Sequence, residues 1–372
     1  MKIKEISKQD TTLFKAIGIL LIVFHNYFNW IPPTIHINEF IFSAEAIKNL
    51  YNGIIHTPFE TINLLFSFFG HYGVQIFIFI SGVGLTRAML HKKTKYGTYI
   101  LHRLKSIYAM LIVAIVFYFL SRIVMDYYIL HSKDWLDLLW KLLLIHTLIP
   151  HQGLSINGPW WFLGLIFQLY LLFPLLFNII RKINLKGVIA ICLFSFACTY
   201  MVIYVFPVPE GIYWMANSIA HLPEFAFGIF VAMNFSKKIH PVIFVAALIV
   251  FILGNFYKIF FPLSFLSITI ILYFIVSKLI TIINKSKWLT KALLNIGTLS
   301  MAIFITHNFF RWRFVAPFSG NWHDKILGSF LFFITIYAVA IVANIFYKWV
   351  IGLFDRITNK LELIDSVETW KL

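Results

Sequence analysis

The sequence predicts an all-α, polytopic membrane helical bundle of about ten transmembrane helices plus one interfacial or re-entrant helix. Of the 372 residues, 60% are hydrophobic and 12% are charged, and the mean hydropathy is +0.84. That charged share is about half the usual one in a soluble domain, and a soluble fold cannot bury so much apolar surface. Apolar runs recur along the chain, and basic residues gather in alternate connections between them. These observations exclude soluble, disordered and disulfide-stapled classes.

Ten segments approach the roughly 20 apolar residues that a helix needs to cross the hydrocarbon core. They are residues 13–30, 67–89, 107–129, 160–180, 187–206, 218–235, 239–256, 262–283, 291–310 and 326–350. With their connections they occupy the whole chain, so we expect a single membrane domain over residues 1–372. No small-residue cleavage site closes the first segment, which we therefore expect to be retained as a span.

The positions of the basic residues predict the orientation. They precede the first segment and follow the second, fourth, sixth and eighth: Lys2, Lys4, Lys8, Lys15, Arg87, Lys92, Lys93, Lys95, Arg103, Lys105, Arg181, Lys182, Lys186, Lys237, Lys238, Lys285, Lys287 and Lys291. The positive-inside rule assigns these alternate connections to the cytoplasm, together with both termini. The net charge of +16 then indicates anionic lipid headgroups, and not nucleic acid, as a partner. Arg311 and Arg313 fall outside and are the exception to the rule.

Two further segments are expected on the outer face. Residues 135–150 are apolar on one helical face, but counting them as a span would invert every later connection, so we expect an interfacial or re-entrant helix. The connection 31–65 carries Glu39, Glu45 and Glu60 with little positive charge, which fits the outer side.

Four ionisable residues within the predicted spans are candidates for function, because such residues are costly in a membrane. They are His25, His71, Glu224 and His307, and the topology places all four in the outer part of their helices, where they would share one cavity. A neutral His25 can take a proton from a hydroxyl group, and Asn29, four residues on, would orient its ring. The alternatives are a histidine bonded to a neighbouring carbonyl, a helix-capping Glu224 and an interfacial His71.

Several cofactor classes lack a signal in the sequence. It shows no Cys/His metal spacing, no phosphate-binding loop and no dinucleotide fingerprint. Cys192 and Cys198 lie in one apolar run and are interpreted as small core residues. We therefore expect no metal and no bound cofactor.

Six segments, taken in order, resemble the acyltransferase-3 family of integral membrane acyltransferases. They are FKAIGILLIVFH at 14–25; HYGVQIFIFISGVGLTR at 71–87; His102 to Lys105; Trp161-Phe162-Leu163 with Tyr170 and Pro174; Phe225 with Gly228; and Gly297, Ser300, Phe304 and His307. The resemblance covers about residues 14–350. Lys15 stands where the family often has Arg, and Ser106 and Ala109 replace its usual Arg and Pro.

The resemblance implies transfer of an acyl group, usually acetyl from acetyl-CoA, to a hydroxyl of a carbohydrate or other surface molecule at the bacterial inner membrane. It also implies an essential role for His25, with contributions from Lys15 and from Arg87 or Arg103. Acyl-CoA would then be a co-substrate, and the acceptor a glycan or a lipid-linked sugar.

The physical chemistry of the residues suggests roles within such a reaction. Lys15, Arg87, Arg103 and Lys105 would form a basic ring for the CoA phosphates, although such charges more commonly face lipid headgroups. His25 would act as general base or transient acyl carrier, and Glu224 or His307 would orient the acceptor. The oxyanion and substrate candidates are Asn29, Ser81, Trp160 and Trp161. A secondary transporter or flippase of a glycan precursor and a structural subunit stay as alternatives.

Overall fold

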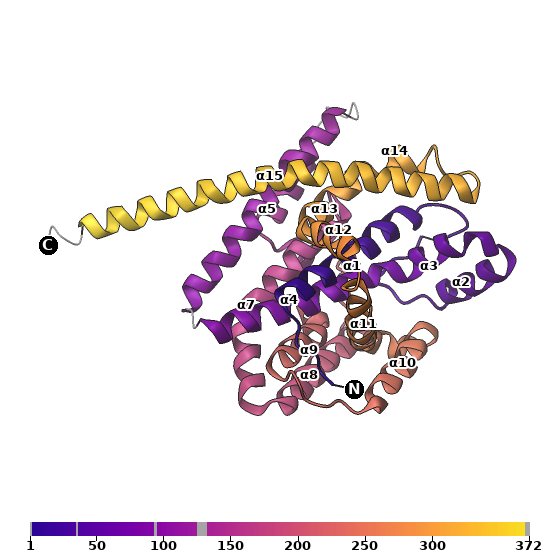
Figure 1. Cartoon of the computed structure of the whole chain (residues 1–372), viewed down its shortest axis with the longest axis horizontal. Helices are drawn as coiled ribbons and strands as arrows, with labels where there is room; N and C mark the ends of the chain where they lie inside the picture. Colours follow the sequence, from indigo (N-terminus) through magenta and orange to yellow (C-terminus); the bar gives the residue numbers. More distant parts are fainter. Residues whose placement is uncertain (1, 35, 93–94, 125–131, 369–372) are drawn as a thin grey trace.

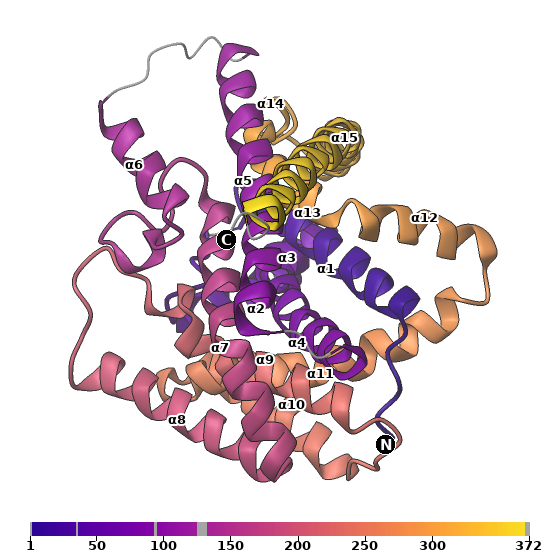
Figure 2. The same ribbon diagram turned by 90° about the vertical axis from the view of Figure 1, so that its left-hand side faces the viewer.

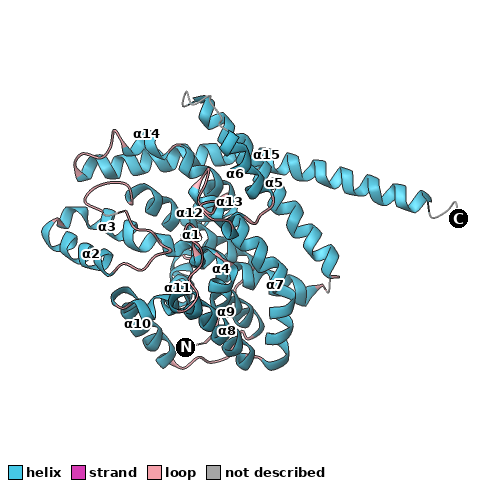
Figure 3. Cartoon of the chain, turned by 180° about the vertical axis from the view of Figure 1, so that it is seen from behind, coloured by secondary structure: helices cyan, strands magenta, loops and turns pink. Residues whose placement is uncertain are grey.

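A computed structural model describes residues 2–34, 36–92, 95–124 and 132–368, and it confirms the all-α prediction for these ranges. Helices joined by short loops make up the chain (Figure 3), and no strand occurs in the ranges described. Their single extended pairing is an isolated bridge between Lys2 and Lys238.

Seven helical stretches in the described ranges are long and apolar enough to cross a membrane, so the predicted count of about ten is not confirmed. They are Lys8–Phe28 (α1), Pro58–His91 (α3, η2 and α4), Tyr96–Val124 (α5), Gly158–Ile183 (containing α7), Leu185–Tyr204 (α8), Lys258–Ile283 (containing α11) and Trp322–Ile357 (within α15). Residues 125–129 of the predicted third span lie outside the described residues.

The other three predicted spans form helices of a different kind. Residues Ser218–Met233 (containing α9, Leu222–Met233) and α10 (Pro241–Phe256) are shorter apolar helices. The predicted span 291–310 breaks into α12 (Lys287–Thr298) and a second part, Ser300–Phe309, bent by 53°. The apolar content of a segment does not show whether its helix changes direction. Here α12 packs closely on α1, and a side chain at Gly297 would collide with the Thr12 carbonyl.

The two segments expected on the outer face contain helices that differ from the prediction. The connection 31–65 contains α2 (Ala44–His56) and the start of α3 (Thr61–Phe69), because Leu50 of α2 packs on Leu64 and Phe68 of α3. The segment 135–150 forms only an 11-residue helix, α6 (Ser132–Leu142), followed by the 3-10 turn η3 (His146–Leu148).

α1 lies at the centre of the bundle (Figures 1 and 2). A capping box of Ser7 and Asp10 starts it, and its last turn contains His25. It packs against α4 (Gly73–His91) and α12, while α4 packs on α9 and α10 on α11. The long helix α15 (Trp322–Glu368) crosses the bundle and projects beyond it (Figure 1).

The direction of the helices defines two ends of the bundle. The end of α1 and the start of α7 (Trp161–Ile183) lie at one end, here named the His25 end. The start of α5 lies at the other, here named the Arg103 end. Along α5, Arg103 and Tyr118 are about 22 Å apart at 1.5 Å per residue, and the Tyr118 ring contacts Trp160 at 6.1 Å between centroids.

A buried ion pair braces the His25 end. Lys325 Nζ of α15 lies 2.5 Å from Glu60 Oε1 and also donates to the Pro32 carbonyl at 2.6 Å. The two charged side chains are only 6% and 14% exposed. The start of α15 is thereby tied to the chain that follows α1.

Candidate active site

A cavity of about 310 Å³ lies at the His25 end. Four segments distant in sequence supply its walls: the end of α1 with the loop to Phe40, the turn at His71, the loop before α7, and the chain from Phe304 to Arg311. Its lining residues are Ile22, His25, Asn26, Asn29, Trp30, His36, Ile37, Asn38, Glu39, Phe40, His71, Val74, Leu154, Gly158, Pro159, Trp161, Phe304, Asn308 and Arg311.

His25 is buried in this wall with one ring nitrogen occupied. Its Nδ1 lies 2.9 Å from the Ser67 carbonyl, and since a carbonyl only accepts, Nδ1 carries the proton in the neutral ring. Nε2 then holds the lone pair and lies 3.6 Å from Glu39 Oε2. The alternative of a histidine bonded to a neighbouring carbonyl is therefore correct for Nδ1, while Nε2 is left able to accept a proton.

Close packing of α1 against the next helical stretch brings the Ser67 carbonyl to His25. A Cβ on Gly70 would lie 2.5 Å from the Leu21 carbonyl oxygen and 2.7 Å from His25 Cβ. A Cβ on Gly73 would likewise collide with the Gly18 carbonyl. Glycine at these positions permits a backbone approach that any side chain would prevent.

Asn29 braces the surroundings of His25 without contacting its ring. Its Oδ1 accepts from the Ile37 amide at 3.0 Å and from the Ser67 hydroxyl at 3.1 Å. Its Nδ2 donates to the Ile37 carbonyl and to His36 Nδ1, both at 3.1 Å. Asn29 thus fixes the loop that carries Glu39, and it acts on His25 through Ser67.

His71 is the second of the four predicted polar residues that lines the cavity. Its ring lies 5.3 Å from the His25 ring, edge to face, and 3.9 Å from the Tyr72 ring. Among the described residues its buried Nδ1 has no hydrogen-bond partner.

Glu224 and His307 are fully buried but do not line the cavity. Glu224 Oε1 lies 3.0 Å from His221 Nδ1, and His221 Nε2 donates to the Met215 carbonyl at 2.7 Å. The His221 ring stacks on Trp161, which does line the cavity, at 6.3 Å. His307 Nδ1 bonds to the Phe304 carbonyl at 2.8 Å, and no described group pairs with its Nε2.

The four predicted CoA-binding residues do not form one ring. Arg103 and Lys105 line a pocket of about 500 Å³ at the Arg103 end, together with Lys348. The Arg103 guanidinium lies over the Tyr99 and Tyr170 rings at 5.5 and 5.8 Å, and Lys105 pairs with Asp355.

The other two basic residues lie apart from that pocket. Arg87 donates to the Ile6 carbonyl and lies 4.0 Å from Glu5, and these three residues line a separate pocket of about 310 Å³. Lys15 lies partly buried on α1 and lines none of the pockets described above.

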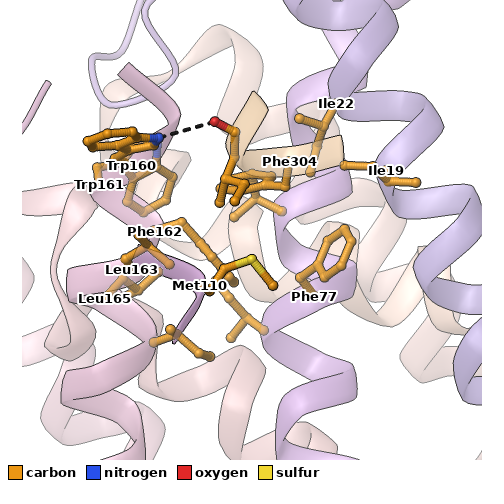
Figure 4. Packing of buried hydrophobic residues seen from close by; sticks show 14 of the residues in the cluster. Ile19, Ile22, Phe77, Met110, Trp160, Trp161, Phe162, Leu163, Leu165 and Phe304 are labelled. Atoms are coloured by element: carbon orange, nitrogen blue, oxygen red, sulfur yellow. Dashed lines mark hydrogen bonds between the residues drawn. The ribbon is translucent and has the colours of Figure 1, made fainter. Parts of the chain in front are cut away.

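The predicted oxyanion and substrate residues separate into cavity and non-cavity groups. Trp160 Nε1 donates to the Ile305 carbonyl at 3.2 Å, as the dashed line in Figure 4 shows, so it is occupied. The Ser81 side chain lies beside Tyr170, nearer the Arg103 end. Asn29 and Trp161 line the cavity.

Three phenylalanine rings pack together beside the cavity, and one of them, Phe304, lines it. Phe77 of α4, Phe162 of α7 and Phe304 of α13 (Ser300–Thr306) have ring centroids 5.3 to 6.4 Å apart (Figure 4). Phe77 lies between His71 and Ser81 on one helical stretch, and neither Phe77 nor Phe162 lines the cavity.

Several polar residues of the cavity were not assigned to the site by sequence reasoning. Three of them are Arg311, Asn308 and Glu39. Arg311 is 7% exposed, with its guanidinium 4.3 Å from the Trp30 ring centroid, and burial lowers its pKa to about 10. Its departure from the positive-inside pattern was the available signal. Asn308 and Glu39 gave none, because their proximity depends on the folding of two loops.

The described residues contain no group of three or more His, Cys, Asp or Glu side chains that could hold a metal ion. The acyltransferase-3 family model, described as an acyltransferase domain, matches residues 10–349, nearly the whole chain. No curated protein and no solved structure matches the sequence.

Proposed function

Because the chain belongs to the acyltransferase-3 family, we propose that it transfers acetyl from acetyl-CoA to a hydroxyl of a cell-surface polysaccharide or its lipid-linked precursor. The observation that carries this proposal is the hydrogen bonding of the His25 ring and its position at the cavity. The Ser67 carbonyl holds its Nδ1, and its Nε2 remains available at a cavity large enough for a sugar ring. A positioned imidazole of this kind is the usual general base for a hydroxyl nucleophile.

The proposed reaction begins with an acceptor hydroxyl next to His25 Nε2. Nε2 takes the hydroxyl proton while the hydroxyl oxygen attacks the thioester carbonyl of acetyl-CoA, forming a tetrahedral intermediate. The carbon–sulfur bond then breaks, and the imidazolium returns its proton to the departing CoA thiolate. The products are an acetyl ester and free CoA, and His25 returns to its starting state.

Two further cavity groups fit the charges that develop in this reaction. The Glu39 carboxylate, 3.6 Å from Nε2, stabilises the imidazolium that forms when His25 takes the proton. The Trp161 indole N–H lines the same cavity and is the donor best placed for the oxyanion. Glu224 positions Trp161 through the stacked His221 ring.

The donor nucleotide is assigned to the Arg103 end. The pocket there combines Arg103, Lys105 and Lys348 with the aromatic rings of Tyr99 and Tyr347. Arginine and lysine bind phosphates through charge-assisted hydrogen bonds, and the Nε of Arg103 has no partner in the described structure. The same end carries the basic connections, which the positive-inside rule assigns to the cytoplasm, where acyl-CoA is found.

The acyl arm must then pass between the helices to reach His25. We place the barrier at the packed rings of Phe77, Phe162 and Phe304, because Phe304 lines the cavity and the other two rings pack against it. A small displacement of these rings would admit the thin pantetheine arm while the nucleotide stays at the Arg103 end. The acceptor enters from the outer face through the mouth formed by the 29–40 loop.

Labelled acetyl-CoA supplied to membranes that contain the protein tests this proposal. We expect alkali-labile label in polysaccharide, and loss of that label with His25→Ala. NMR of the surface glycan from a deletion strain should show missing O-acetyl signals and so identify the acceptor. Movement of a glycan precursor without any incorporated label would overturn the proposal in favour of a transporter.

A further inference from the structure

Two residues in the wall of the cavity carry buried polar atoms that nothing in the described protein satisfies. Arg311 Nε and Asn308 Oδ1 are both buried without a hydrogen-bond partner among the described residues, and both residues line the cavity. Asn308 uses its amide nitrogen to donate to Asn157 Oδ1 at 2.7 Å, which aligns the side chain. One orphaned donor and one orphaned acceptor therefore lie three residues apart.

Arg311 is a buried cation without a matching carboxylate. No Asp or Glu oxygen of the described chain comes within ion-pair distance of it. Its environment is instead aromatic, with Trp30 at 4.3 Å and Trp312 at 5.2 Å from the guanidinium carbon to the ring centroids. Cation–π contact stabilises a guanidinium by less than the burial of an unpaired charge costs.

Glu39 is the one acidic residue among those that line this cavity. It lies against His25 Nε2, and a carboxylate that stabilises the imidazolium is not available to pair with Arg311. The cavity thus lacks an anion at the Arg311 wall, where a guanidinium offers geometry suited to carboxylate or phosphate oxygens. The CoA phosphates are assigned to the opposite end, so this charge is not needed for the donor.

We propose that Arg311 binds an anionic group of the acceptor while Asn308 Oδ1 accepts a hydrogen bond from one of its hydroxyls, so that the acceptor is an acidic glycan. The proposal rests on the proposed function, because it places the acceptor at His25. The anionic group is a carboxylate, as in a uronic acid, or a phosphate ester on the sugar.

Binding of three probes to the purified full-length protein tests this proposal without any donor. The probes are methyl glucoside, methyl glucuronide and methyl glucoside 6-phosphate. Because a hydrogen bond to a charged group contributes about 1.5–3 kcal/mol, one of the anionic probes should bind about 10- to 150-fold more tightly than the neutral glucoside. Which anion binds more tightly distinguishes the carboxylate from the phosphate source.

Variants assign the preference to Arg311. Arg311→Gln should abolish the preference for the anionic probe, Arg311→Lys should retain part of it, and the exposed neighbour Arg313→Gln should leave it intact. Equal affinity for all three probes in the wild-type protein would overturn the proposal, and so would a preference that survives Arg311→Gln. Because His25→Ala should keep the binding preference yet lose acetyl transfer, failure of this proposal is distinguishable from failure of the proposed function.

Discussion

Replacing Asn29 with Ala removes a brace that supports His25 from outside its own helix. Asn29 makes four hydrogen bonds of 3.0 to 3.1 Å, two of them to the amide and carbonyl of Ile37. The loop is partly exposed, so water replaces some of what is lost. At about 0.5–1 kcal/mol for each bond, the closed loop loses about 2–4 kcal/mol.

That loss has a measurable consequence for local opening. Each 1.4 kcal/mol is a factor of ten, so the open population of the loop should rise roughly 30- to 1000-fold. Hydrogen–deuterium exchange of the detergent-solubilised full-length protein should show this acceleration at the amide of Ile37. Acetyl transfer should also fall, because the loop holds Glu39 beside His25 and the Ser67 hydroxyl loses its partner.

Asn255→Ala is the matched control. The Asn255 amide donates only to the Phe251 carbonyl one turn earlier on its own helix, and Asn255 does not line the cavity. This variant should leave exchange at Ile37 unchanged. If Asn29→Ala also leaves that exchange unchanged, the reasoning that Asn29 fixes the loop is refuted.

Three other changes give expected outcomes. Gly70→Ala should lower stability by about 1–3 kcal/mol in a thermal unfolding assay and reduce acetyl transfer, because its Cβ would overlap α1. In the same assay Gly84→Ala should be neutral or slightly stabilising, because a Cβ at Gly84 meets nothing within 4 Å. Lys325→Met should cost about 3–5 kcal/mol by leaving Glu60 buried and unpaired, and adding Glu60→Gln should restore part of that loss in the same assay. Burial lowers the pKa of Lys141 from 10.5 to about 7, so the unfolded chain binds one more proton between these pH values and stability should rise with pH across them. Lys141→Met should lose that rise in Tm, and an unchanged pH dependence would contradict the assigned burial.

The fold class follows from composition, but the span count does not. An apolar run of the sequence overlaps each of the seven long apolar stretches, since membrane burial requires apolar side chains in helices. Hydropathy does not register the break at Leu299 or the shortness of the helices at 218–233 and 241–256, which depend on packing against neighbours. The helix α2 was missed because it is amphipathic, and its apolar face is buried mainly against α3.

The sequence predicted members of the candidate site only where a single side chain was unusual for its surroundings. His25 and His71 stood out because ionisable groups are scarce within the spans, and both line one cavity. The Ser67 carbonyl that fixes the His25 tautomer left no mark on the sequence, since any residue supplies a carbonyl. Glu224 was expected at the cavity, but its carboxylate is hydrogen-bonded to His221, three residues earlier in the chain.

The basic residues show a similar limit. Arg87 lies near the end of α4 and Arg103 in the early turns of α5, so their closeness in sequence suggested one binding ring. The folded chain gives them different partners, because Arg87 turns to the Ile6 carbonyl and Arg103 to the Tyr99 and Tyr170 rings. Charge patterning predicts a side of the membrane but not a shared pocket.

The central claim is that His25 performs the proton transfer while the donor is held at the Arg103 end. The most direct measurement compares acetyl-CoA affinity with the acetyl-transfer rate in the purified protein and its His25→Ala and Arg103→Ala variants. We predict that His25→Ala binds acetyl-CoA as the wild type does while its transfer rate falls about 10²- to 10⁴-fold, and that Arg103→Ala loses affinity. Wild-type transfer by His25→Ala would contradict the account.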